Sequence, residues 1–140
     1  MLSLPLQVQF GSDGDYLPWA LGGWSGDQDD RTHTWTEEYV AKLRLPLEAA
    51  NNDRLLIADV IPHDSDDQDL FLYVNGLFGA FWRVKSAVEV TASLENALFK
   101  PGDNVFAFVM PRATRPSDTR PGGDARLLGC AFRSLALMDL

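Results

Sequence analysis

The sequence is poor in the side chains that build covalent or metal-centred sites, with one cysteine and two histidines among 140 residues. The single cysteine, Cys130, excludes an intramolecular disulfide, and its apolar surroundings in LLGCAF predict a buried thiol in a central strand. His33 and His63 form no His-x-His pair, and no Cys-x-x-Cys pair is present, so the usual zinc and iron ligand sets are missing. We therefore expect no transition-metal centre and no cofactor.

Long hydrophobic runs are also missing. The longest uninterrupted apolar stretch, residues 105–110, is far too short to span a bilayer, so we expect no membrane span. Ser3, Pro5 and Gln7 interrupt the apolar residues at the N-terminus, and no basic segment precedes them, unlike a secretory signal. These features predict a cytoplasmic protein. A domain cut from a larger protein would have the same features.

Positive charge is scarce, with 12 basic against 20 acidic residues and a net charge of −8. The imbalance lies in residues 1–70, which hold 14 acidic and 4 basic residues, whereas residues 71–140 hold 6 and 8. The first half would repel a polyanion, and the second half has no Lys/Arg cluster interleaved with aromatic residues. Nucleic acid is therefore not an expected partner.

The chain does contain a series of short β-rich segments separated by turn signals. Apolar residues make up 46% and charged residues 23%, as in a soluble globular chain, and the length suits one domain over residues 1–140. Period-two alternation between turns is typical of an all-β antiparallel sandwich. The predicted strands span residues 7–10, 33–36, 40–47, 54–61, 70–75, 77–84, 87–91, 104–111 and 127–138.

Four local patterns add detail. Asn75-Gly76, between two β-rich runs, supplies the two positive-φ positions of a type I′ hairpin. The segment SLENALF predicts at most one short helix, with Ser93 as its N-cap. In YVAKLRLPL, strict alternation cannot place Val40 on the same face as Leu43, Leu45 and Leu47, so we expect a small irregularity near Ala41. Residues 111–123, rich in proline and arginine, predict a long exposed loop.

Aromatic and acidic residues crowd the first third of the chain, where Trp19, Trp24 and Trp35 lie within 17 residues. Sugar binding needs aromatic faces for the apolar side of the ring and polar side chains for the hydroxyls, and both types occur here. Alternatively, Trp24 and Trp35 plug the end of a sandwich, with their indole N–H groups bonded to the backbone. The polar residues between these two tryptophans include Asp27, Gln28, Asp29, Asp30 and Arg31.

Four segments carry a resemblance to a known family: VQFGSDGDYLPWALGGWS, WTEEYVAKLRLPL, LFLYVNG and DARLLGCAFRSLALMDL. In order and spacing they resemble the small β-sandwich accessory domain found beside bacterial glycosyltransferases and in polysaccharide-biosynthesis proteins. The resemblance implies a jelly-roll-like, carbohydrate-binding-module fold over nearly the whole chain. The family usually has a glutamate before a Trp or Gly at the acidic step, where this chain has GDQDDRTHTW. The matched positions are Phe10-Gly11, Gly23-Trp24-Ser25, Asp29 or Asp30, Trp35-Thr36, and residues 126–129 and 133–135.

We therefore expect a non-catalytic module that binds carbohydrate, working with a glycosyltransferase or another polysaccharide-synthesis protein. One alternative is a protein-interaction or assembly module with both tryptophans in the core. Another is a small sugar-active enzyme, which needs two converging carboxylates that the sequence does not show. The candidate sugar-binding residues are Trp24, Trp35, Asp27, Asp29, Asp30 and, from the loop before the last strand, Arg112.

The acidic run from Asp64 to Asp69 resembles half of a calcium loop, because carboxylates at alternate positions suit a hard cation. The run lacks the central glycine and the late bidentate glutamate of such a loop. The other interpretation is a solvated acidic turn between two strands. The sequence leaves both open.

Overall fold

A computed structural model describes residues 1–26, 30–63 and 67–140 as strands joined by loops and three short 3-10 segments, η1 (Leu17–Trp19), η2 (Asn96–Leu98) and η3 (Pro116–Asp118). None of the described segments is a helix that is long and apolar enough to cross a membrane. The strands are β1 (Leu6–Gln9), β2 (Thr34–Trp35), β3 (Val40–Leu47), β4 (Arg54–Pro62), β5 (Gln68–Val74), β6 (Leu77–Val84), β7 (Val88–Leu94), β8 (Gly102–Val109) and β9 (Cys130–Asp139).

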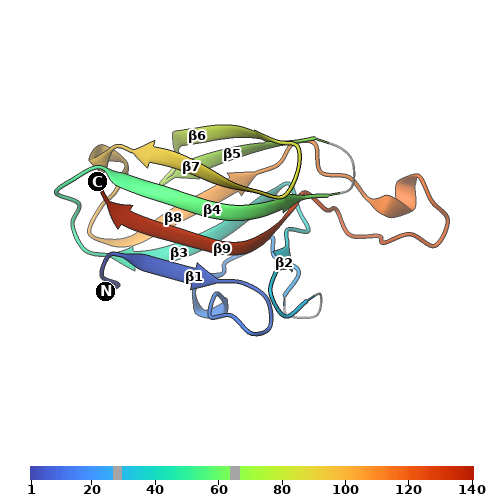
Figure 1. The fold of residues 1–140 in the computed structure, drawn as a ribbon, viewed down its shortest axis with the longest axis horizontal. Coiled ribbons are helices and arrows are strands. Elements are labelled where there is room, and N and C mark those ends of the chain that lie inside the picture. Colours follow the sequence, from blue (N-terminus) through green and yellow to red (C-terminus); the bar gives the residue numbers. More distant parts are fainter. Residues whose placement is uncertain (27–29, 64–66) are drawn as a thin grey trace.

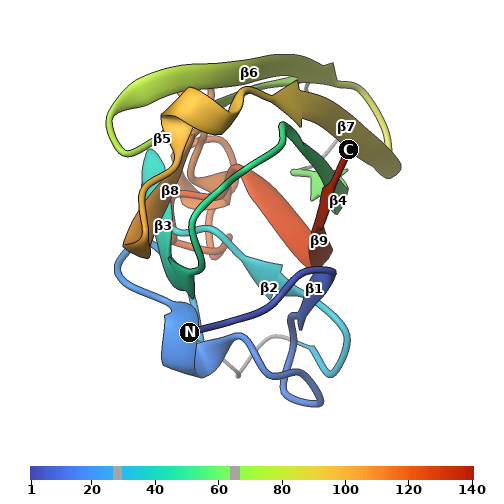
Figure 2. The same cartoon turned by 90° about the vertical axis from the view of Figure 1, so that its left-hand side faces the viewer.

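These strands form two antiparallel sheets packed face to face (Figures 1 and 2). One sheet has the order β1-β9-β4-β7, with β2 also pairing with β9, and the other has the order β3-β8-β5-β6. Neighbours in space are mostly distant in sequence, as in a jelly roll. The predicted all-β, jelly-roll-like sandwich is confirmed.

The core lies between the sheets and follows the alternation of the strands. In β3 the side chains of Ala41, Leu43, Leu45 and Leu47 are fully buried, and the intervening residues face outward or are half-buried. The predicted irregularity near Ala41 is wrong, because β3 pairs with β8 in an unbroken register. Ala41 belongs to the inner face, and Val40 is simply half-buried on the outer face. Register shifts occur instead at Asp59/Val60 and at Leu72/Tyr73.

The predicted hairpin is confirmed, because Asn75 and Gly76 alone join β5 to β6 and have φ values of 52° and 80°. The predicted helix is reduced to the 3-10 turn η2, and Ser93 does not cap it. Ser93 lies in β7 and pairs with Leu55 of β4. Pairing with β4 therefore provides hydrogen-bond partners for the backbone of this segment. As a result, β7 extends further than the local sequence predicts.

The last strand and the loop before it also agree with the sequence. Cys130 is fully buried at the start of β9, and desolvation raises the pKa of its thiol to about 12. Residues 111–123 extend beyond the sheets (Figure 1) and are mostly exposed, although Ala113 and Pro116 are buried. A bridge between Thr114 and Leu128 closes this loop at its base.

Candidate functional site

Two loops come together beside β2, at the end of the sandwich from which residues 111–123 extend. The Ser12 and Asp13 amides donate to the carbonyl oxygens of Asp30 and Arg31, both at 3.0 Å. The Gly11 amide donates to Oγ1 of the buried Thr34 at 2.9 Å. These bonds fix residues 30–33 against residues 11–13, so charged side chains from both loops share one surface.

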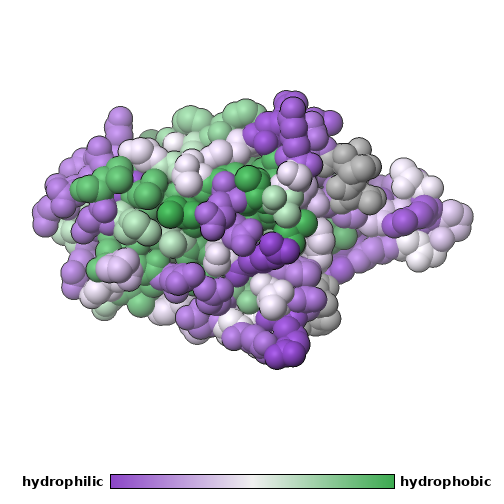
Figure 3. Space-filling model, in the orientation of Figure 1, coloured by the Kyte–Doolittle hydropathy of each residue, from purple (hydrophilic) through white to green (hydrophobic). Residues whose placement is uncertain are grey.

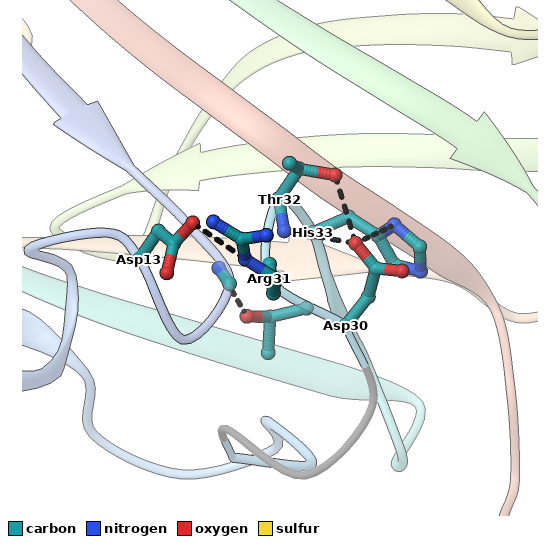
Figure 4. A network of polar contacts seen from close by, with 7 residues as sticks. Asp13, Asp30, Arg31, Thr32 and His33 are labelled. Carbon is teal, nitrogen blue, oxygen red and sulfur yellow. Dashed lines mark hydrogen bonds and ion pairs between the residues drawn. The ribbon is translucent and has the colours of Figure 1, made fainter.

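That surface carries both signs of charge (Figure 4). Arg31 Nε lies 3.0 Å from Asp13 Oδ2, and both side chains are largely exposed. Asp30 Oδ1 accepts from the amide and the hydroxyl of Thr32, both at 2.8 Å, and lies 3.4 Å from His33 Nδ1. The Thr32 amide and then its hydroxyl lower the pKa of Asp30, so this carboxylate is ionised at neutral pH.

A shallow cavity of about 160 Å³ opens between the two loops. Exposed ion pairs contribute little to stability. Asp13 and Arg31, which line the cavity, can therefore separate and bind ligand hydroxyls at a small cost in free energy. The cavity is lined by Gln9, Phe10, Asp13, Gly14, Arg31 and Thr32.

Trp35 lies next to this surface on the outer face of the five-stranded sheet. Its neighbours in the strand, Thr34 and Thr36, are buried, and Trp35 is half-buried on the opposite face, paired with Ala131 of β9. The imidazole of His33 meets the indole at a centroid distance of 6.0 Å and that of His63 at 5.8 Å, both nearly perpendicular to it.

A second carboxylate, that of Asp124, lies close to His63. Arg126 donates to both oxygens of Asp124, with Nη2 at 2.6 Å from Oδ2. The hydrogen bonds from Arg126 lower the pKa of Asp124 to about 2, and the nearby His63 contributes to the same shift. Trp35 is thus bordered by two histidines, each with an ionised carboxylate close by. Figure 3 shows hydrophilic residues around this end, whereas the middle of the same sheet is largely hydrophobic.

Trp24, the other candidate tryptophan, packs against the core. Its indole lies 5.1 Å from the Phe10 ring and 5.2 Å from the Phe132 ring, and its Nε1 donates to the Lys42 carbonyl at 2.9 Å. It also bridges to Thr36, whose side chain faces inward. The structure therefore places Trp24 and Trp35 on opposite faces of β2.

The remaining candidates divide into two groups. Asp27 and Asp29 lie outside the described residues, as does the first half of the acidic run, Asp64 to Asp66. Arg112 is exposed, and no described contact joins its side chain to Trp35 or Asp30; its carbonyl accepts from Gln68 Nε2 at 3.5 Å. Within residues 1–26, 30–63 and 67–140, no group of three or more His, Cys, Asp or Glu side chains could hold a metal ion.

Sequence reasoning missed several residues near Trp35, namely His33, His63, Asp124 and Arg126. The Asp-x-Arg spacing at residues 124–126 was a signal for a local ion pair, but not for its position. The contacts depend on β9 lying between β2 and β4, an order that strand patterns do not encode.

A row of aromatic side chains on the outer face of the four-stranded sheet was also missed. Phe71 and Phe81 lie 4.8 Å apart, and Tyr73 and Phe78 lie 6.0 Å apart. Phe81 is 44% exposed, whereas Trp82 packs inward with Nε1 donating to the Thr91 carbonyl at 2.8 Å. Phe71 and Tyr73 are two residues apart and therefore share one face of their strand, and the two-residue Asn-Gly turn determines which residues of β6 lie opposite them. This pattern could have predicted the aromatic row from the sequence.

Comparison with known proteins gives a fold but no family. No family model matches the sequence, and no curated protein matches it either. Several solved structures do. The CBM36-1 domain of a multidomain xylanase from the hindgut metagenome of Trinervitermes trinervoides has a TM-score of 0.59 at 8% identity, covering 96% of this chain and 97% of that one.

Two further modules give similar values. CBM35 from Cellvibrio japonicus Abf62 has a TM-score of 0.58 at 10% identity, covering 95% of this chain and 91% of its own. The C-terminal CBM6 of LamC from Zobellia galactanivorans has a TM-score of 0.57 at 7% identity, covering 96% and 98%. At such low identities the likeness shows the fold alone. The chain has the β-sandwich fold of carbohydrate-binding modules.

Proposed function

We propose that this chain is a non-catalytic carbohydrate-binding module with its sugar contact at Trp35. One observation carries the proposal: a half-buried indole on the outer face of a sheet, bordered by His33 and His63, has ionised carboxylates close to both histidines. The shared fold supports it, since one structural neighbour, a CBM36 module, was solved in complex with calcium and xylotriose.

The chemistry of the surface suits a neutral sugar. An aromatic ring packs against the C–H face of a pyranose, while carboxylates accept hydrogen bonds from hydroxyls and guanidinium groups donate them. Asp30 and Asp124 supply acceptors, and Arg31 and Arg126 supply donors. Asp27 and Asp29, which precede Asp30 in the sequence, and Arg112 remain candidates for further hydroxyl contacts.

The proposed partner is an enzyme that acts on polysaccharide. Resemblance of the sequence to glycosyltransferase-associated domains favours a synthetic enzyme. The structural neighbours belong to other enzymes, including a xylanase and a β-(1,4)-mannanase. Either kind of enzyme would use the module in the same way, to hold a glycan near a separate catalytic domain.

Replacing Trp35 with alanine should weaken oligosaccharide binding by about 1 to 3 kcal/mol, because the aromatic contact with the sugar ring is lost. Stability should fall only slightly, since the indole lies outside the core. A glycan array with the wild-type protein would identify the ligand, and calorimetric titration of wild type, Trp35→Ala and Trp35→Phe would measure the affinities. Trp35→Phe keeps an aromatic face and should retain much of the binding.

Two results would contradict the proposal. One is a wild-type protein that binds no glycan on the array. The other is a Trp35→Ala variant that binds as tightly as wild type, with an unchanged urea midpoint showing that it is folded.

A second candidate function is assembly, favoured by the exposed side chains of β6. Leu77 is 54%, Phe78 57% and Phe81 44% exposed, and β6 is the last strand of its sheet, with no further strand paired to it in the described part of the chain. An apolar strand at a sheet edge is suited to pairing with another strand. The occupant would be β6 of a second copy, forming an antiparallel pair.

If two copies pair through β6, the wild-type protein should sediment as a dimer. Phe78→Ser should weaken this association at least tenfold, because it removes apolar surface from the edge strand. Sedimentation equilibrium over a concentration series would measure this. Lys85→Ser, a polar change just beyond the strand, is the control. A wild type that stays monomeric at the highest soluble concentration removes this candidate.

A further inference from the structure

Strand β9 contains a bulge in its first half. Its register with β4 shifts at this point, because Phe132 pairs with Val60 whereas Ser134 pairs with Asp59, the preceding residue of β4. Arg133, between them, is left out of the pairing. A bulge of this kind changes the direction of the side chains around the extra residue.

The bulge turns two successive polar side chains away from the core. Phe132 before them and Leu135 after them are fully buried. Arg133 is exposed and Ser134 is half-buried. A regular strand would place Ser134 on the same side as Phe132, facing the core. Because of the bulge, both polar side chains lie on the outer face of the five-stranded sheet.

This outward pair lies on the same face as Trp35 and close to it along β9. Trp35 pairs with Ala131, and Arg133 follows Ala131 by two residues, which is about 7 Å of strand. Gln9 of β1 pairs with Ser134, so β1 and β2 lie one after the other along the same edge of β9 (Figure 1). A sugar chain that extends from Trp35 in this direction reaches Arg133 next.

The side chains around the bulge offer both donors and acceptors to a ligand. Arg133 Nη1 lies 3.8 Å from Asp59 Oδ1, close enough for attraction but too far for a hydrogen bond. The two side chains are 46% and 29% exposed, so ligand atoms can reach both. The guanidinium donates and the carboxylate accepts, while the Ser134 hydroxyl and the Gln9 amide do both.

The charges at the bulge favour a neutral ligand. Glu89 of β7 pairs with Asp59 and is exposed, so two carboxylates accompany the single guanidinium of Arg133. An anionic group placed there would be repelled by both carboxylates. Sugar hydroxyls avoid this repulsion, because each hydroxyl can accept from the guanidinium and donate to a carboxylate.

We infer that Arg133, Asp59, Ser134 and Gln9 form a second subsite, for the sugar ring next to the one on Trp35. The ligand is then a chain of neutral sugars lying along β9, not a single sugar. Because the path along the strand is straight, the chain must be extended, as β-(1,4)-linked chains are. This subsite rests on the proposed function, since Trp35 holds the first ring.

NMR titration of ¹⁵N-labelled protein can follow the two places separately, through the Trp35 Nε1–Hε1 and Arg133 Nε–Hε signals. The probes are xylose and xylohexaose, mannose and mannohexaose, and glucose and cellohexaose. With at least one hexasaccharide, both signals should shift saturably. That hexasaccharide should bind at least tenfold more tightly than its monosaccharide, because it adds hydrogen bonds at the bulge.

Arg133→Ala should weaken hexasaccharide binding about tenfold, because it removes charge-assisted hydrogen bonds, and should leave monosaccharide binding unchanged. Arg44→Ala is the matched control. Arg44 is an exposed arginine on the outer face of the other sheet, in a similarly long ion pair with Asp103 at 4.0 Å, and its loss should not affect binding. Trp35→Ala should weaken the binding of both probes.

Three outcomes would overturn the second subsite and leave the contact at Trp35 standing. One is equal affinity of the wild type for a hexasaccharide and its monosaccharide. Another is a hexasaccharide that shifts the Trp35 signal and not the Arg133 signal. The third is an Arg133→Ala variant, folded by its urea midpoint, that binds the hexasaccharide as tightly as Arg44→Ala does.

Two further results separate this subsite from the proposed function. If none of the three hexasaccharides binds although the glycan array is positive, the extended neutral chain is wrong and the proposed function stands. If Trp35→Ala leaves hexasaccharide binding unchanged, the proposed function is wrong, and the continuous path from Trp35 to Arg133 is wrong with it.

Discussion

Replacing Trp24 with alanine should cost about 3 to 5 kcal/mol of unfolding free energy, through the cavity that it leaves beside the core. The indole packs against the rings of Phe10 and Phe132, and Phe10 in turn lies 5.1 Å from the Tyr16 ring. The substitution also removes the donor to the Lys42 carbonyl. Urea unfolding followed by far-ultraviolet circular dichroism would give the midpoint and slope for each variant.

Trp35→Ala is the matched control, because it removes the same side chain from the opposite face of β2. Its cost should be well below that of Trp24→Ala. Trp24→Phe should recover most of the packing and lose about 1 kcal/mol for the missing hydrogen bond. If Trp24→Ala unfolds at the wild-type midpoint and also loses sugar binding, Trp24 belongs to the binding surface and the core assignment is wrong.

The two tryptophans show what the sequence could and could not predict about the site. Both follow a small polar or glycine-rich stretch, and both lie near acidic residues, so they look alike in the chain. In the structure, alternation in β2 turns Trp35 away from the buried Thr34 and Thr36, while a bridge to Thr36 brings Trp24 inward. Local alternation predicts only that Trp35 lies on the opposite face from Thr34 and Thr36, and which face is buried depends on the pairing of β2 with β9. The direction of Trp24 depends on a contact between loops.

The strands were predictable for a similar reason. β3 begins and ends where its alternation predicts, β6 matches its predicted β-rich run, and the Asn75-Gly76 turn needs only local backbone geometry. Ser93 was misassigned because its role depends on Leu55, a pairing partner far away in the sequence. Arg54 also looked like an ordinary strand residue, since only the assembled fold closes Phe99 and Glu48 around its guanidinium.

Substituting Gly23 with alanine should destabilise the fold by roughly 2 to 5 kcal/mol, from backbone strain and overpacking together. Gly23 has a φ of +95°, which side-chain-bearing residues rarely adopt, and a Cβ there would lie 2.1 Å from the Val40 carbonyl oxygen. The Gly23 carbonyl accepts from the Glu37 amide at 2.8 Å, so the backbone cannot shift freely. The urea midpoint of Gly23→Ala would measure this cost.

Gly22→Ala is the matched control for this change, one residue earlier in the same turn. No atom lies within 4 Å of a Cβ at Gly22, and its φ is not in the left-handed region. Alanine there should be neutral or should stabilise by up to about 1 kcal/mol, because it restricts the unfolded chain. Equal midpoints for the two variants would show that the contact between Gly23 and the start of β3 does not exist in solution. A large loss for Gly23→Ala alone would show that this turn holds Trp24 in place through close backbone packing.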